Sequence, residues 1–163
     1  MSSEKTGVLF VCLGNICRSP IAEAVFLDIL RKKNLLNQFT VDSAAIIDYH
    51  LGKPPDKRAL QTLEKHGLKD YSHRVRQIHL DDLKNFHFIF GMDEDNMCDL
   101  KSLKKEAGKD AHAKVQLLGS HDPQGNVTIP DPYYGTDIRD FENVYQQCVR
   151  CCNGFLKSLG YSV

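Results

Sequence analysis

Cys12 and Arg18 are the residues of this sequence whose types and spacing most directly indicate chemistry. A cysteine thiolate is a strong nucleophile, and the planar guanidinium of an arginine can hold two oxygens of a phosphoryl group. The Cys-x5-Arg spacing alone is weak evidence, because so short a pattern matches by chance. Its context is stronger, since the apolar run at residues 8–11 precedes it and a helical pattern follows it.

Residues 12–19 are predicted to form the loop between a buried strand and a helix. Pro20 suits a first helical turn, and apolar residues then recur at helical spacing. In such a loop, backbone N–H groups converge on an anion beside the positive end of the helix. This field favours a thiolate at Cys12, Gly14 is expected to permit the turn, and Ser19 is expected to hydrogen-bond the sulfur.

Further strands and helices must hold this loop in place. Strand-like segments near residues 39–44, 86–90 and 115–118 alternate with amphipathic segments near 56–66 and 93–105, as in β-α-β units. A last helix carries one apolar stripe, formed by Phe141, Val144, Tyr145, Cys148, Cys151, Cys152, Phe155, Leu156 and Leu159.

The predicted fold is a single α/β domain over residues 1–163. We expect an open, twisted, mainly parallel sheet of about four strands, with helices on both faces. The phosphate-binding loop follows the first strand, because sites in such sheets gather at the carboxyl ends of strands.

The charge balance and the cysteines limit the class of protein. Lys and Arg number 21, as do Asp and Glu, so no overall field favours nucleic acid or a membrane surface. No leader and no apolar span are recognised, so a soluble, cytoplasmic protein with reduced thiols is expected. No ligand spacing for a metal is found, and no metal or other cofactor is expected.

Residues 11–26, VCLGNICRSPIAEAVF, resemble the signature of the low-molecular-weight protein tyrosine phosphatases of the animal type. The resemblance extends along nearly the whole chain. Its further blocks are Asp42-Ser43-Ala44-Ala45, Gly52-Lys53-Pro54-Pro55, residues 73–77, Met92-Asp93-Glu94, Asp131-Pro132-Tyr133-Tyr134-Gly135 and residues 145–152.

The resemblance implies hydrolysis of phosphotyrosine and small aryl phosphates through a cysteinyl-phosphate. Cys12 would be the nucleophile and Arg18 would bind the phosphoryl group. Asp131 would act as general acid and then as general base, because a phenolate of pKa about 10 leaves poorly without a proton. The phosphate-binding loop would comprise Leu13, Gly14, Asn15, Ile16, Cys17, Arg18 and Ser19.

The resemblance also implies residues around this centre. Tyr49, Tyr133 and Tyr134 would form the wall against the substrate ring. A supporting hydrogen-bond network would consist of Asn15, Ser19, Ser43 and His73. The stretch at residues 48–50 and the pair Arg74-Val75 depart from the family pattern at the rim and affect substrate preference.

The remaining cysteines and one apparent triad are assigned other roles. Cys17 is close enough to Cys12 along the chain to form a protective disulfide on oxidation. Cys148 and Cys151 have a redox-like spacing but lie on the apolar stripe, which favours core packing. Ser120-His121-Asp122 is a loop, since catalytic triads assemble from separated positions.

Several alternatives stay open at this stage. An arsenate reductase of the same fold would need two further cysteines near mid-chain, where Cys98 stands alone. A redox-sensing phosphotyrosine-binding module would lack turnover. The apolar strand at residues 86–92, which leads into Asp93-Glu94-Asp95, faintly resembles that of the aspartate-nucleophile phosphatases that need magnesium, although Met97 stands where they have threonine or valine. Arginine phosphatases are also similar, but they carry threonine in place of Ile16.

Partners are expected to be phosphotyrosine proteins, with no nucleic acid and no membrane. The chain is expected to be a monomer or to associate weakly with itself through exposed tyrosines.

Overall fold

A four-stranded parallel sheet forms the centre of the computed structural model, which describes residues 4–162. The strand order is β2-β1-β3-β4, and neighbouring strands run parallel. The strands are β1 (Thr6–Cys12), β2 (Phe39–Ala45), β3 (Phe88–Gly91) and β4 (Lys114–Leu117).

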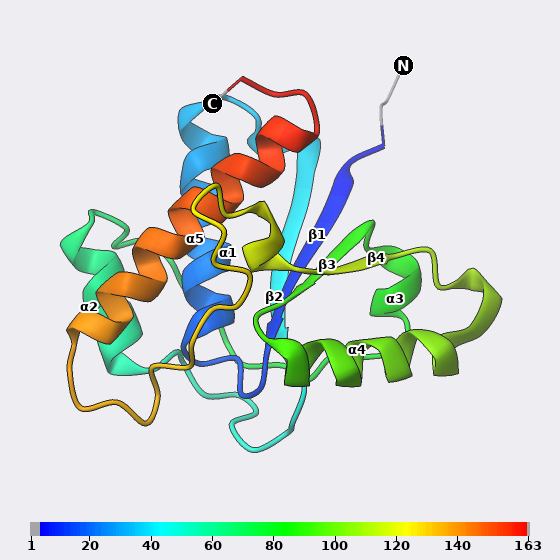
Figure 1. Ribbon diagram of the computed structural model, residues 1–163, viewed down its shortest axis with the longest axis horizontal. Helices are drawn as coiled ribbons and strands as arrows, with labels where there is room; N and C mark the ends of the chain where they lie inside the picture. The colour runs from blue at the N-terminus through cyan, green and yellow to red at the C-terminus, as the bar shows by residue number, and fades with distance from the viewer. Residues whose placement is uncertain (1–3, 163) are drawn as a thin grey trace.

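Helices cover both faces of this sheet (Figure 1). Helices α1, α2 and α5 lie on one side of the strands, and α3 and α4 lie on the other. Their bounds are α1 (Arg18–Lys32), α2 (Lys57–Lys65), α3 (Asp82–Asn85), α4 (Glu94–Ala107) and α5 (Arg139–Ser158), with short 3-10 helices at Leu36–Gln38, Gly108–Asp110 and Leu118–His121. The predicted fold class is therefore confirmed.

The central position of β1 explains its continuous apolar run. Val8 and Phe10 point into the core under α1 and α5, whereas Leu9 and Val11 point into the core under α4. The Phe10 ring packs edge-on against Phe26 of α1 and stacks beside a phenylalanine of β3. Because both faces of the strand are buried, no alternation of polar residues is possible there.

Two local expectations need correction. Helix α1 begins at Arg18, so Arg18 and Ser19 belong to its first turn and the loop proper is residues 13–17. Leu159 lies beyond the end of α5 and is 37% exposed.

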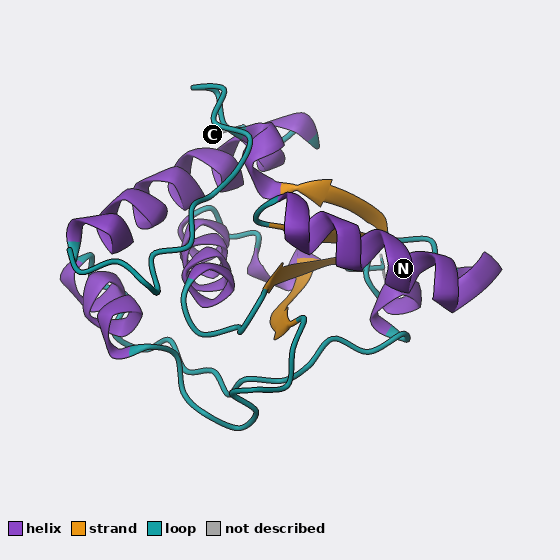
Figure 2. Ribbon diagram, turned by 60° about the horizontal axis from the view of Figure 1, so that its bottom comes forward, coloured by secondary structure: helices purple, strands orange, loops and turns teal. Residues whose placement is uncertain are grey.

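The loops that follow the strands lie together at one edge of the sheet (Figure 2). The register of β1 with β2 pairs Phe10 with Ser43 and Cys12 with Ala45, which brings the end of β1 beside the second strand. Asp93 follows β3 directly. Parallel strands thus bring residues far apart in sequence to one place. Among residues 4–162, no helix is long and apolar enough to cross a membrane.

Gly154 marks the closest approach of α5 to the segment after β4. A Cβ atom at this position would meet the carbonyl oxygen of His121. We therefore expect Gly154→Ala to destabilise the protein by roughly 1–3 kcal/mol, the usual cost of overpacking. Helix propensity alone would predict a gain of about 1 kcal/mol. Urea denaturation measures the difference, and Lys157→Ala on the exposed face is the control, with a change within about 0.5 kcal/mol. A gain in stability for Gly154→Ala contradicts the packing argument.

Candidate active site

The loop between β1 and α1 turns at Asn15 and not at Gly14. Within the described loop residues 13–17, only Asn15 has a positive φ, of 57°. Asparagine tolerates this left-handed conformation better than most residues with a side chain. Gly14, expected to permit the turn, instead lies against the His50 ring, whose Cδ2 is 3.1 Å from the place that a Cβ atom would take. Because Gly14 has no side chain, the His50 ring can pack closely against the loop.

The side chain of Asn15 connects four segments of the chain. Its Nδ2 donates to Ser19 Oγ at 2.8 Å and to Ser43 Oγ at 3.0 Å. Its Oδ1 lies 2.7 Å from His73 Nε2, which acts as the donor because Asn15 Oδ1 can only accept. The structure thus brings together the four residues expected to support the loop, and their hydrogen bonds offset the strain of the positive φ.

Cys12 lies at the end of β1 with hydrogen-bond donors around its sulfur. The backbone N–H of Asn15 donates to Cys12 Sγ at 3.2 Å, and Ser19 Oγ lies 3.0 Å from the same sulfur. Since Ser19 Oγ already accepts a hydrogen from Asn15 Nδ2, its own hydrogen is free to point at the sulfur. This arrangement favours a sulfur anion.

The first turn of α1 offers further positive charge. Its N-cap residue, Cys17, makes no side-chain capping bond, so the first N–H groups of the helix are available to an anion. Arg18 is the first residue of this helix, and its side chain is only 3% exposed.

Arg18 is held by two acceptors from distant segments. Its NH1 donates to Asp93 Oδ2 at 2.6 Å and to the carbonyl oxygen of Ile129 at 3.0 Å. Burial opposes the charge, but Cys12, Asp93 and Asp131 together raise the pKa of the guanidinium. The Nε atom is buried and has no acceptor among residues 4–162. A buried donor without a partner is costly, so this edge of the fork suits a bidentate oxyanion.

Asp93 contacts the anion-binding arginine although no pattern in the sequence indicated this role. The residue follows β3 directly and caps α4, since its Oδ1 accepts the backbone N–H of Asn96 at 2.8 Å. Its other oxygen is thereby aimed at Arg18. The position of Asp93 directly after a predicted strand was a signal for a site residue. Nothing local indicated its partner, because Arg18 lies 75 residues away in the sequence.

Asp131 stands at the edge of the cavity above Arg18. Its Oδ2 lies 3.5 Å from Arg18 NH2, and its Oδ1 accepts the backbone N–H of Tyr133 at 3.1 Å. The loop is tied to the end of β3, because the N–H of Ile129 donates to the carbonyl oxygen of Met92 at 2.8 Å. The carboxylate is 30% exposed, so it reaches both Arg18 and the entrance.

A cavity of about 320 Å³ opens above the phosphate-binding loop. The three tyrosines expected at its wall lie around its mouth, and the rings of Tyr133 and Tyr134 meet at right angles, 4.9 Å apart. His50, from the stretch at residues 48–50 that was expected at the rim, also lines the cavity, as does Ile47, which was not singled out from the sequence. The full lining is Cys12, Leu13, Gly14, Ile16, Cys17, Arg18, Ile47, Tyr49, His50, Asp131, Tyr133 and Tyr134.

The other cysteines are free thiols, most of them buried. Burial raises the pKa of the Cys17 thiol, although Cys17 also lines the cavity. Cys148 and Cys151 lie in the core with Cys152, and burial raises the pKa of Cys151 to about 12. These core thiols are poor nucleophiles at neutral pH.

The consecutive Ser120-His121-Asp122 does not form a triad. Asp122 pairs with Arg150, at 3.0 Å between Oδ1 and Nε, and His121 Nε2 lies 3.0 Å from Gln116 Oε1. Ser120 Oγ donates to the carbonyl oxygen of Leu117. The three side chains therefore have separate partners.

Comparison with known proteins agrees with this geometry. Residues 7–163 match the family model described as low molecular weight phosphotyrosine protein phosphatase. The proteins of that name from Homo sapiens and Gallus gallus are 53% and 50% identical, over 96% of this chain in each case and over 98% and 97% of their own lengths.

Two solved structures are also similar. The crystal structure of Primo-1 has a TM-score of 0.88 and 48% identity, and a Drosophila arginine phosphatase has a TM-score of 0.89 and 36% identity. In both pairs the match covers 96% of this chain and 99% of the other. The family model and the relatives span nearly the whole sequence, and the chain therefore belongs to the low molecular weight phosphotyrosine protein phosphatase family.

Proposed function

We propose that this chain hydrolyses phosphotyrosine and small aryl phosphates through a cysteinyl-phosphate on Cys12. The observation that carries the proposal is the pairing of two groups in one cavity. Cys12 Sγ is surrounded by donors, and Arg18 presents a buried Nε without an acceptor among the described residues. A nucleophile beside an unfilled bidentate donor suits attack on a phosphoryl group.

Arg18 would bind the phosphoryl group in both the ground state and the transition state. Asp93 and Ile129 occupy NH1, which orients the guanidinium and leaves Nε and NH2 as the pair that faces an oxyanion. As the sulfur attacks, charge spreads over the equatorial oxygens, and a fixed fork can follow it without reorganising. The free N–H groups of α1 would contribute the same stabilisation.

Asp131 would supply the proton that a tyrosine leaving group needs. Its carboxylate lies beside Arg18 NH2 and lines the cavity, which supports a place on the side of a bound phosphoryl group where the leaving oxygen would depart. In the second step, the same carboxylate would accept a proton from the water that attacks the cysteinyl-phosphate. Ser19 would donate a hydrogen bond to the departing sulfur.

The wall of tyrosines supports an aryl substrate. Tyr49, Tyr133 and Tyr134 surround the entrance and offer flat faces for a phenyl ring. Phosphotyrosine proteins are thus the proposed partners.

The proposed setting is the cytoplasm, where the six free thiols of this chain would stay reduced. We propose a monomer that associates weakly through these exposed tyrosines, with no affinity for nucleic acid or membranes because the net charge is zero.

Phosphoarginine is the second substrate to be tested, because one similar structure is an arginine phosphatase. In this chain Ile16 is buried and lines the cavity, where its bulk would exclude a guanidinium. Arsenate reduction is disfavoured, because Cys98 is an exposed residue of α4 and the thiols of Cys148, Cys151 and Cys152 are buried in the core, away from the cavity. Retention of both Cys12 and Asp131 favours turnover over a pure binding module.

Steady-state hydrolysis of an aryl phosphate in excess chelator tests the mechanism. Cys12→Ser is expected to abolish turnover, because the nucleophile is lost. Asp131→Ala is expected to lower kcat by roughly 10²–10⁴-fold, the usual contribution of a general acid. The matched control is an aryl phosphate whose leaving group is strongly acidic, for which the Asp131→Ala loss should be much smaller. Turnover that survives in Cys12→Ser, or stops in chelator, contradicts the proposal.

The bond from Asp93 to Arg18 gives a second prediction. Asp93→Asn keeps the cap on α4 but removes the charged hydrogen bond, which is worth about 1.5–3 kcal/mol. We expect kcat/KM to fall by roughly 10- to 150-fold, and the melting temperature to fall as well, because the buried Arg18 loses its charged partner. Asp93→Ala also removes the cap and should cost about 1 kcal/mol of stability in addition. An unaltered kcat/KM in Asp93→Asn would show that Asp93 does not orient the guanidinium.

Reversible oxidation gives a third prediction. Peroxide would oxidise Cys12 to a sulfenic acid, and the Cys17 thiol would then displace water to form a disulfide. After peroxide and then a dithiol reductant, the wild type is expected to recover most of its activity and Cys17→Ser little of it. Cys98→Ser, which removes an exposed thiol, is the matched control and should recover like the wild type. Equal recovery in all three proteins refutes the disulfide.

A further inference from the structure

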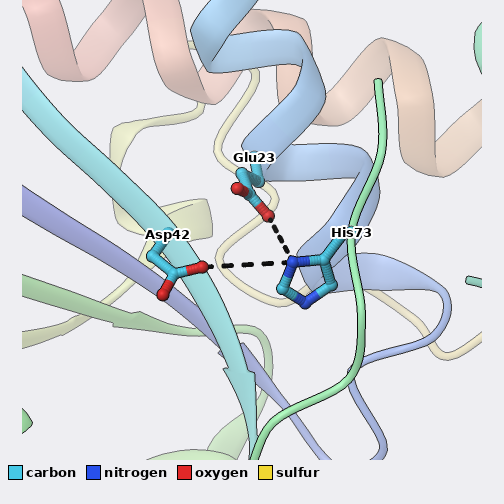
Figure 3. A group of neighbouring side chains, drawn as sticks. All are labelled: Glu23, Asp42 and His73. Carbon is cyan, nitrogen blue, oxygen red and sulfur yellow. Dashed lines mark ion pairs between the residues drawn. The ribbon is translucent and has the colours of Figure 1, made fainter. Parts of the chain in front are cut away.

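The two loops of the active site are supported from different parts of the fold. Behind the phosphate-binding loop, His73 forms the ion pairs that Figure 3 shows, with Nδ1 3.5 Å from Glu23 Oε1 and 4.0 Å from Asp42 Oδ1. His73 also hydrogen-bonds to Asn15 of that loop. Among residues 4–162, no hydrogen bond or ion pair of these three residues extends to the loop that carries Asp131. The general acid must therefore be held by other residues.

The segment at residues 130–136, which we call the acid loop, has few hydrogen bonds to the rest of the protein. Two of its N–H groups donate to acceptors within the loop itself. The NH2 of Arg18 lies 3.5 Å from Asp131 Oδ2, which is longer than a hydrogen bond of about 2.7–3.2 Å. In the described part of the chain, Arg58 is the one residue outside the acid loop that hydrogen-bonds to it.

Arg58, in the first turn of α2, holds the acid loop with both terminal nitrogens of its guanidinium group. Its NH1 donates to the carbonyl oxygen of Gly135 at 3.1 Å, and its NH2 donates to the carbonyl oxygen of Tyr133 at 3.0 Å. Because the guanidinium is rigid and planar, two such bonds fix the orientation of the loop as well as its distance. The N–H of Tyr133 donates in turn to Asp131 Oδ1 at 3.1 Å, so the residue that Arg58 holds also orients the carboxylate.

Arg58 is itself fixed from two sides. Asp56 accepts from its Nε at 3.1 Å and from its NH2 at 3.0 Å, and the guanidinium carbon lies 4.6 Å from the centre of the Phe141 ring of α5. Phe141 is fully buried, so it provides a rigid surface for the guanidinium. The backbone N–H of Asp56 donates to the carbonyl oxygen of Ile16 at 2.8 Å. A continuous series of bonds therefore connects the phosphate-binding loop, through Asp56 and Arg58, to the acid loop.

We propose that Arg58 is a positioning residue for the general acid. The role rests on the proposed function, in which Asp131 gives its proton to the leaving oxygen. That transfer requires the carboxyl group within about 2.6–3.2 Å of the oxygen, and a misplacement of about 1 Å can cost on the order of 100-fold in rate. Arg58 is not among the residues that line the cavity, and Asp56 compensates its charge, so its contribution is the placement of the acid loop.

The dependence of the rate on the leaving group tests this role. Arg58→Met removes the donors and keeps an apolar chain over the Phe141 ring. For phenyl phosphate, whose leaving group needs a proton, we expect kcat/KM to fall by roughly 10- to 100-fold. For an aryl phosphate with a strongly acidic leaving group the loss should be less than about 3-fold, and inhibition by inorganic phosphate should be unchanged, because the phosphate-binding loop is intact. Arg58→Lys keeps the charge without the planar fork and should show a smaller loss with the same selectivity.

Two further variants complete the test. The matched control is Arg139→Ala, which removes an exposed arginine paired with Asp137 at 2.7 Å and should leave both rates unchanged. In Asp131→Ala no carboxyl group remains to be positioned, so adding Arg58→Met should change kcat/KM by less than about 2-fold. A positioning role for Arg58 is overturned by equal losses on the two substrates, or by a full additional loss in the double variant.

The same assay separates the role of Arg58 from the proposed function. A selective loss in Asp131→Ala without one in Arg58→Met contradicts the role of Arg58 and leaves the general acid in place. If Asp131→Ala shows no selective loss, the assignment of the general acid is wrong, and the role of Arg58 is wrong with it.

Discussion

The side-chain hydrogen bonds of Asn15 are the interaction on which the site depends. They hold a left-handed residue in the middle of the loop, and they join that loop to Ser19 of α1, Ser43 of β2 and His73. Without them, the strained turn would relax and the donors around the Cys12 sulfur would separate. The parallel register of β1 and β2 makes these bonds possible, because it places Ser43 near the end of the first strand.

Charge is concentrated in this site although the chain as a whole is neutral. Arg18 is buried with Asp93 on one side and Cys12 on the other, and Asp131 lies at the rim. A buried charge is tolerated only where partners compensate it. Asp93 compensates one end of the guanidinium and leaves the other end for an anion, so a single ion pair both stabilises the folded protein and prepares it to bind phosphate.

Local patterns in the sequence predicted the elements, and contacts between distant segments had to come from the structure. The run at residues 8–11 indicated a strand with both faces buried. The Cys-x5-Arg spacing indicated an anion-binding loop because it lies at the junction of that strand with a helix. Gly14 was expected to permit the turn, because glycine is the most permissive residue, whereas Asn15 makes the turn with a positive φ and the help of three side-chain hydrogen bonds. The contacts of Arg18 with Asp93 and of Glu23 with His73 join residues with no local signal.

Transfer of the phosphoryl group to Cys12 is the step on which the proposed function depends. Rapid acid quenching of an aryl phosphate reaction, followed by peptide mass spectrometry, tests it most directly, since the cysteinyl-phosphate accumulates when its hydrolysis is slowed. We expect one added phosphoryl group on the peptide that contains Cys12. A phosphoryl group on Asp93 or another residue, or complete turnover with no labelled peptide at any time, would contradict it.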